Sequence, residues 1–131
     1  MKSLVVDDDF THRLLLQRFL STTGEVHIAA NGVEAVQAVR GAIREGQPYD
    51  LVCLDIMMPE LDGHTALLQI RQLEDELHVP AAEQVKVVMT TALTEKGHVL
   101  DAFREQADAY LSKPVSKDRL LGYVREWKLA G

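Results

Sequence analysis

The stretch LVVDDDF, residues 4–10, joins an apolar run to three consecutive carboxylates. The run LVV is apolar without alternation, which is typical of a strand covered on both faces. Asp9 is a favoured helix N-cap, and an apolar helical period at Leu15, Leu16 and Phe19 follows it. Because like charges a few ångströms apart resist joint ionisation, we expect a positive charge that the sequence itself does not supply to lie beside the carboxylates.

The same order of apolar run, turn and helix recurs along the chain, which is typical of βαβ units. We predict strands at Ser3–Val6, Glu25–Ala29, Leu51–Leu54, Val85–Met89 and Ala109–Leu111. The five predicted helices follow the cap residues Asp9, Asn31, Asp62, Thr94 and Ser116. This (βα)5 order predicts the α/β class, with a doubly wound, five-stranded parallel sheet and helices on both faces.

Composition limits the function classes. The 131 residues fit a single domain, residues 1–131, and the net charge of −6 disfavours direct binding to nucleic acid or to an anionic membrane surface. The only cysteine, Cys53, lies in an apolar run, which favours a buried structural thiol in a reducing compartment. No stretch is as long and apolar as a membrane span, so we expect a cytoplasmic protein.

Polar residues stand at the ends of four predicted strands. They are Asp7 and Asp8, then Asp55, then Thr90 and Thr91, and finally Ser112 and Lys113. Ligand sites of doubly wound sheets lie at the carboxyl ends of the strands, so we expect these side chains to converge. Carboxylates, a hydroxyl and an ammonium together suit phosphoryl transfer to an aspartate, with Mg²⁺ held by carboxylate and carbonyl oxygens.

Four motifs at these strand ends, LVVDDD, LDIMMPELDG, VVMTTA and AYLSKP, follow one another in the order found in response-regulator receiver domains. The chain resembles this family over essentially its whole length. The resemblance implies a flavodoxin-like sheet with the strand order 2-1-3-4-5. It also implies a stand-alone, chemotaxis-regulator-like signalling phosphoacceptor, which is not an enzyme on other substrates.

The resemblance also implies roles for individual residues. Asp55 matches the phosphoacceptor, and Lys113 matches the lysine that pairs with the phosphoryl group. Asp7 and Asp8 match the acidic pair that holds Mg²⁺ or Mn²⁺ together with Asp55 and the backbone carbonyl of Met57. Thr91 matches the switch hydroxyl, and Tyr110 matches the aromatic residue that moves with it.

A sensor histidine kinase or a phosphotransfer protein is the phosphodonor that the resemblance implies. The downstream protein target is unknown, and the chain is expected to be a monomer or a phosphorylation-dependent dimer. Two segments depart from the family pattern. The connection LHVPAAEQ, residues 77–84, is long, and Val115 follows the Lys-Pro pair where many members carry Phe, which affects partner choice more than chemistry.

Two alternatives stay open. Residues 7–11 also satisfy the D-x-D-x-T motif of haloacid-dehalogenase-type phosphatases, in which Asp7 would be the nucleophile and Asp9 the acid/base. A degenerate receiver acting only as a contact module is the second. Five dispersed histidines lack the spacing of a helical metal pair, and we interpret them as structural or surface residues, with His12 and His64 near the rim of the cleft.

Overall fold

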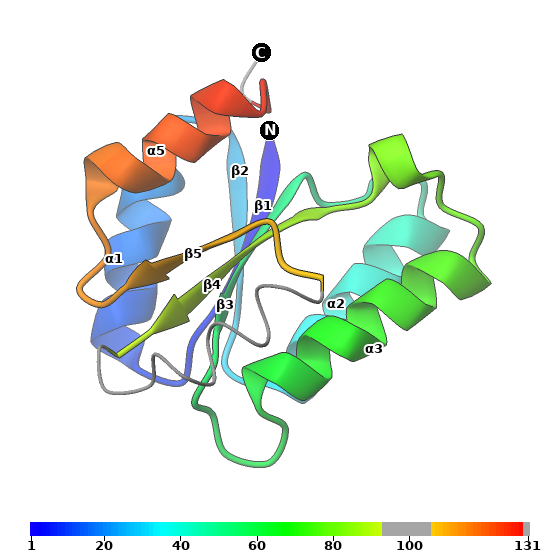
Figure 1. The fold of residues 1–131 in the computed structure, drawn as a ribbon, viewed down its shortest axis with the longest axis horizontal. Coiled ribbons are helices and arrows are strands. Elements are labelled where there is room, and N and C mark those ends of the chain that lie inside the picture. The colour runs from blue at the N-terminus through cyan, green and yellow to red at the C-terminus, as the bar shows by residue number, and fades with distance from the viewer. Residues whose placement is uncertain (93–105, 130–131) are drawn as a thin grey trace.

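The chain forms a parallel sheet between two layers of helices (Figure 1). This computed structural model describes residues 1–92 and 106–129. The strands are β1 (Lys2–Val6), β2 (Glu25–Ala29), β3 (Leu51–Asp55), β4 (Lys86–Thr91) and β5 (Ala109–Ser112). The helices are α1 (Phe10–Leu20), α2 (Gly32–Arg44), α3 (Gly63–Glu76) and α5 (Lys117–Glu126), with a 3-10 turn, η1 (Ala81–Glu83), before β4. The order β2-β1-β3-β4-β5, parallel throughout, confirms the predicted sheet.

The observed strands differ from the predicted ones where polar residues take part in the backbone pairing of the sheet. The structure includes Asp55 in β3, ends β5 at Ser112 and shifts β4 from Val85–Met89 to Lys86–Thr91. In the register of the sheet, Asp55 is opposite Thr90 and Thr91 is opposite Ser112. The apolar pattern marks only the part of a strand that packs against helices, so it misses polar residues that continue the backbone pairing.

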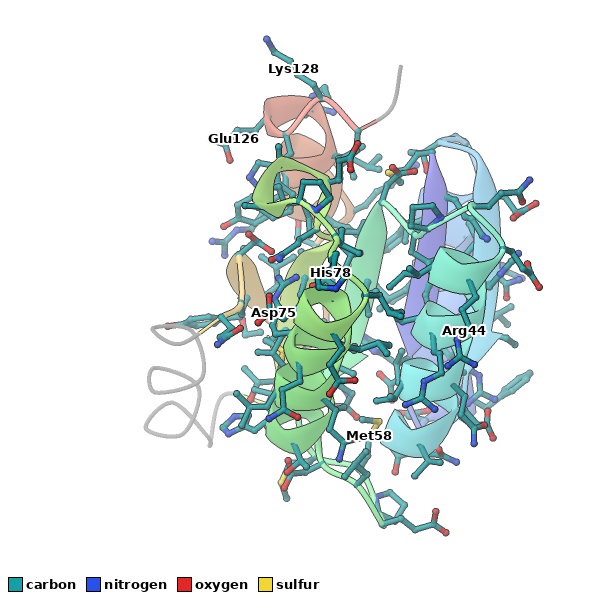
Figure 2. All side chains as sticks on the ribbon, turned by 90° about the vertical axis from the view of Figure 1, so that its right-hand side faces the viewer. Arg44, Met58, Asp75, His78, Glu126 and Lys128 are labelled. Atoms are coloured by element: carbon teal, nitrogen blue, oxygen red, sulfur yellow. The ribbon has the colours of Figure 1, made fainter. Side chains whose placement is uncertain are left out.

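Alternate side chains of the central strands form two cores on opposite faces. Leu4 and Val6 of β1 pack beneath α2 and α3, whereas Val5 packs beneath α1 and α5. Figure 2 views the first of these faces, where buried Met58 lies between α2 and α3. Every residue of β3 is buried. The predicted covering of the sheet on both faces is confirmed.

Helix starts agree with the predicted caps. Asp9, Asn31, Asp62 and Ser116 each accept a backbone hydrogen bond from the first turn of their helix. The helix predicted after Thr94 lies outside the described residues. Within the described ranges, no helix combines the length and hydrophobicity needed to cross a membrane.

The buried face of α1 agrees in part with the predicted one. Leu16 is buried as predicted, Phe19 is partly buried and packs against the same core, and Leu15 is partly exposed, whereas Leu20 is buried without having been predicted. His12 takes the remaining buried position, one turn before Leu16. A buried polar residue such as His12 cannot be recognised from the spacing of apolar residues along the helix.

A buried ion network ties α3 to the amino ends of β4 and β5. The Arg71 guanidinium donates to Glu74 Oε1 at 2.8 Å and to Asp108 Oδ2 at 3.1 Å. It also donates to the carbonyls of Val85 and Gln106. The long connection of residues 77–84 is therefore anchored, because Glu74 in turn accepts the Val85 N–H at 2.7 Å.

Candidate functional site

The structure brings the predicted strand-end residues to one edge of the sheet. They are Asp7, Asp8, Asp55, Thr91 and Lys113. Lys113 is the residue directly after β5, its N–H donates to the Thr91 carbonyl at 2.7 Å, and its peptide bond to Pro114 is cis. The convergence expected from the topology is therefore observed for the segments that carry the site.

Lys113 connects two of the carboxylates. Its ammonium lies 3.1 Å from Asp7 Oδ2 and 3.2 Å from Asp55 Oδ1. Asp7 is 0% exposed and Asp55 is 3% exposed, whereas Asp8 is exposed. The cation expected beside the LVVDDDF carboxylates is thus supplied in part by the chain itself, from a segment distant in sequence.

Burial and charge shift the pKa values of these groups in opposite directions. Burial and the Asp7 charge raise the pKa of Asp55 to about 7, although Lys113 opposes the rise. Burial also acts to raise the pKa of Asp7, but the hydrogen bonds from His12 and the Asp9 backbone, together with Lys113, hold it below its usual value. Burial acts to lower the pKa of Lys113, but Asp55 and Asp7 outweigh it and raise the pKa. Asp55 is therefore the carboxylate that gains most from a further cation.

The donor set fits a hard divalent cation. Asp7, Asp8 and Asp55 each offer a carboxylate oxygen, and these oxygens lie within 4.8 Å of one another. Mg²⁺ prefers oxygen ligands and usually keeps several waters, so three carboxylates are sufficient protein ligands. Three acids facing one lysine also leave an excess of negative charge for the ion to neutralise. The carbonyl of Met57 stays a predicted ligand.

Comparison with known proteins decides the family. The family model for the response regulator receiver domain matches residues 3–125, nearly the whole chain. The chain belongs to the receiver domain family. Receiver domains of the CheY type are signalling phosphoacceptors of two-component systems, so the resemblance noted from the four motifs is confirmed.

Relatives of this receiver domain differ greatly in length. The chemotaxis protein CheY of Bacillus subtilis is 35% identical over 125 residues, which cover 94% of this chain and 93% of CheY. Hybrid signal transduction histidine kinase L of Dictyostelium discoideum is 31% identical over 127 residues, which cover 96% of this chain and 7% of the kinase. Related receiver sequences thus make up most of one small protein and a small part of a much larger one.

Solved structures confirm the fold. The receiver domain of sensor histidine kinase PA1611 from Pseudomonas aeruginosa has a TM-score of 0.77 and 25% identity, covering 96% of this chain and 95% of that one. That structure holds a magnesium ion in its active-site cleft. The co-crystal structure of the Saccharomyces cerevisiae phosphotransfer protein Ypd1 with the receiver domain of Ssk1 has a TM-score of 0.82 and 28% identity, covering 100% of this chain and 92% of the matched chain.

His12 makes a contact with the site residue Asp7 that the sequence did not predict. Its Nδ1 lies 2.6 Å from Asp7 Oδ2, and the residue is 7% exposed. The sequence places His12 near the rim of the cleft as a structural or surface residue, which agrees with its position, but it does not predict the hydrogen bond to Asp7. A separation of five residues across a turn has no helical or strand period, and only the position of His12 just after the acidic turn could have indicated it.

The phosphatase alternative loses its support. Asp9, the acid/base of that hypothesis, is exposed, and its Oδ1 accepts the backbone N–H groups of Thr11 and His12 as the cap of α1. The hypothesis also leaves buried Asp55 at the end of β3 without a role. The family match agrees with the receiver interpretation over nearly the whole chain.

Gly63, the first residue of α3, packs against the backbone of the candidate acceptor. A Cβ at Gly63 would lie 2.3 Å from the Asp55 carbonyl oxygen and 2.8 Å from Ile56 Cα. We therefore expect Gly63→Ala to lower the free energy of unfolding by about 1 to 3 kcal/mol, because backbone atoms must move. Urea denaturation measures this change.

Gly41 provides a matched control for that substitution. It lies within α2, and a Cβ there would meet no atom within 4 Å. We expect Gly41→Ala to raise the free energy of unfolding by about 0.4 to 1 kcal/mol. Equal effects of the two substitutions would contradict the close approach at Gly63.

The remaining residues singled out from the sequence lie as follows. Met57 is exposed, whereas Met58 is buried. Burial raises the pKa of the Cys53 thiol to about 12, which agrees with a structural role. Thr91 is buried at the end of β4, and Tyr110 is partly buried on β5 beside the core beneath α2 and α3.

Proposed function

We propose that this receiver domain accepts a phosphoryl group on Asp55 in a reaction that requires Mg²⁺. The observation that carries the proposal is the position of the Lys113 ammonium, 3.2 Å from Asp55 Oδ1 in a site with three convergent carboxylates. A lysine beside the acceptor meets the charge of an incoming phosphoryl group at the place where the new bond forms. A degenerate receiver that acts only as a contact module would not require Lys113 beside Asp55.

Each residue has a role in the proposed step. A carboxylate oxygen of Asp55 attacks phosphorus, the new O–P bond forms, and the P–N bond to a phosphohistidine breaks, leaving the electron pair on an imidazole that takes up a proton. Lys113 balances charge on the phosphoryl oxygens, and Asp7, Asp8 and Asp55, with the Met57 carbonyl, hold the metal. Bound Mg²⁺ supplies charge neutralisation at the phosphoryl oxygens; Mn²⁺ suits the same oxygen ligands.

The raised pKa of Asp55 supports this assignment. A carboxylate with a pKa of about 7 carries negative charge that the protein alone stabilises poorly. Such a group gains from a nearby cation, which favours its ionised and nucleophilic form. Asp7, whose pKa is held low, stays ionised as a ligand instead.

The output of the receiver domain is a change of protein partner. We infer that Thr91 moves toward the phosphoryl group and that Tyr110 follows, which repacks the surface around β5 and α5. Thr91 is 5% exposed, and its hydroxyl donates to the Ala92 carbonyl at 3.1 Å, at the end of the strand next to β3. A short movement along β4 is therefore sufficient to couple the site to β5.

Thr91 variants test this switch. In the wild type, Mg²⁺ with beryllium fluoride, an analogue of the phosphoryl group, is expected to shift the ring NMR signals of Tyr110. Thr91→Val removes the hydroxyl at similar volume and is expected to abolish that shift, whereas Thr91→Ser keeps the hydroxyl and the shift. A full response in Thr91→Val would contradict the role of the hydroxyl.

The proposed partners follow from the family. A sensor histidine kinase or a phosphotransfer protein is the donor, and an unidentified protein is the target, with no direct contact to nucleic acid. We propose one receiver domain over residues 1–131 that is a phosphoacceptor and no enzyme on other substrates. We also propose a cytoplasmic location and a monomer or phosphorylation-dependent dimer.

Labelling with a small phosphodonor tests the proposal. We expect acetyl phosphate with Mg²⁺ to add one phosphoryl group, detected by intact mass, and chelation of Mg²⁺ to prevent it. Asp8→Asn removes one predicted ligand and should strongly reduce labelling, whereas Asp75→Asn changes an exposed aspartate at the far end of α3 and should not (Figure 2). Labelling that is independent of Mg²⁺ would overturn the proposed chemistry.

A further inference from the structure

His12 makes a buried contact that the proposed phosphoryl chemistry does not use. Its Nδ1 lies 2.6 Å from Asp7 Oδ2, and the His12 side chain is 8% exposed. An ionised carboxylate only accepts hydrogen bonds, so His12 Nδ1 carries a hydrogen atom and donates a hydrogen bond to Asp7 Oδ2. The contact is therefore a short, charge-assisted hydrogen bond inside the protein.

The environment of His12 Nε2 indicates which contact of this side chain is important. Among the described residues, His12 Nε2 is buried and has no hydrogen-bond partner. A histidine that served mainly to connect elements of the core would be expected to use both nitrogens, because an unpaired buried nitrogen costs free energy. The polar contact that holds this ring is the one to Asp7.

The Asp7 carboxylate is held by three segments of the chain. Oδ1 accepts the Asp9 N–H at 2.8 Å, whereas Oδ2 receives His12 Nδ1 and, at 3.1 Å, Lys113 Nζ. Lys113 also pairs with Asp55, so its contact with Asp7 is shared. Of the two side chains on Oδ2, His12 is the one with no second carboxylate partner.

We propose that His12 is a positioning residue that fixes the Asp7 carboxylate for the divalent cation. This inference rests on the proposed function, in which Asp7 is a metal ligand. In the proposed product Lys113 also balances the charge of the phosphoryl group, which leaves His12 as the partner devoted to Asp7. Asp9 supports the arrangement, because its side chain caps the turn of α1 that carries His12.

Three substitutions of His12 test the proposal. Asn places its side-chain N–H where Nδ1 lies, Gln places its N–H where Nε2 lies, and Leu has no donor. We measure Mn²⁺ binding to the full chain by electron paramagnetic resonance, with unfolding by urea measured in parallel for each variant. This readout separates an effect on the metal ligand from an effect on stability.

The expected result is a loss of Mn²⁺ affinity of about tenfold or more in His12→Leu and His12→Gln, as for other residues that hydrogen-bond a metal ligand. His12→Asn should bind within about threefold of the wild type, because it keeps the donor to Asp7. Wild-type affinity in His12→Leu would overturn the inference, as would an equal loss in Asn and Leu. If His12→Leu does not fold, the Mn²⁺ affinities of His12→Asn and His12→Gln are compared instead, and equal affinities would overturn the inference.

Asp8→Asn distinguishes this inference from the proposed function. If Asp8→Asn and His12→Leu both weaken Mn²⁺ binding, both ideas are supported. If only Asp8→Asn weakens it, the metal site stands and the role of His12 is wrong. If Asp8→Asn binds Mn²⁺ like the wild type, the carboxylate site itself is wrong.

Discussion

Replacing Arg71 by Met is expected to lower the free energy of unfolding by about 3 to 5 kcal/mol, the usual cost of removing one partner of a buried ion pair. Glu74 is 2% exposed, and the substitution leaves its carboxyl group buried without the guanidinium that pairs with it. The substitution also removes the donors to the Val85 and Gln106 carbonyls. Urea denaturation of the metal-free protein at neutral pH measures the change.

A second variant identifies the cause of that loss. Glu74→Gln removes the buried negative charge but keeps an oxygen that can accept the Val85 N–H, which the carboxylate accepts at 2.7 Å. We expect Arg71→Met with Glu74→Gln to be more stable than Arg71→Met alone. A loss below about 1 kcal/mol in Arg71→Met would mean that the network contributes little, as exposed ion pairs do.

Asp55→Asn is expected to prevent phosphorylation completely and to stabilise the metal-free protein at pH 8. Burial and the Asp7 charge raise the pKa of Asp55 to about 7 in the folded protein, above its ordinary value of 3.8. The folded state therefore binds more protons than the unfolded state between these values, so the stability contributed by Asp55 falls as pH rises through this range.

Asparagine avoids the cost of the ionised carboxylate. At pH 8 we expect Asp55→Asn to raise the free energy of unfolding by roughly 1 to 3 kcal/mol over the wild type. At pH 5 the difference should shrink, because Asp55 is then protonated in the folded wild type. Urea denaturation at both pH values, with a chelator present, tests this expectation.

Two results would argue against the raised pKa of Asp55. One is a destabilised Asp55→Asn protein at pH 8, and the other is a stability difference that does not change with pH. Mg²⁺ in excess provides a further control, because an ion that binds only the folded state stabilises it, and it does so more when it binds more tightly. The ion should therefore favour the wild type, which keeps all three carboxylates, over Asp55→Asn.

Much of the fold was predictable because its signals are local. An apolar run, a cap residue and a helical period recur in order, and the caps Asp9, Asn31, Asp62 and Ser116 all lie where predicted. The rule that parallel strands end at a common edge then places Asp55 and Lys113 together before any coordinates are known. The order of the strands came from the family resemblance.

The contacts that sequence analysis missed join residues without a regular spacing. His12 reaches Asp7 across a turn, and Arg71 reaches Asp108 from another element. Both polar residues occupy buried positions that a hydrophobic pattern assigns to apolar side chains. Such pairs depend on how two elements pack, which neither propensity nor periodicity describes.

The most direct test of the central claim is the position of the phosphoryl group. The protein is incubated with acetyl phosphate and Mg²⁺, the acyl phosphate is trapped with borohydride, and the modified peptide is identified by mass spectrometry. We expect a single modification at Asp55, which is lost when Mg²⁺ is chelated. Modification at Asp7 instead, or no modification of folded protein with metal present, would contradict it.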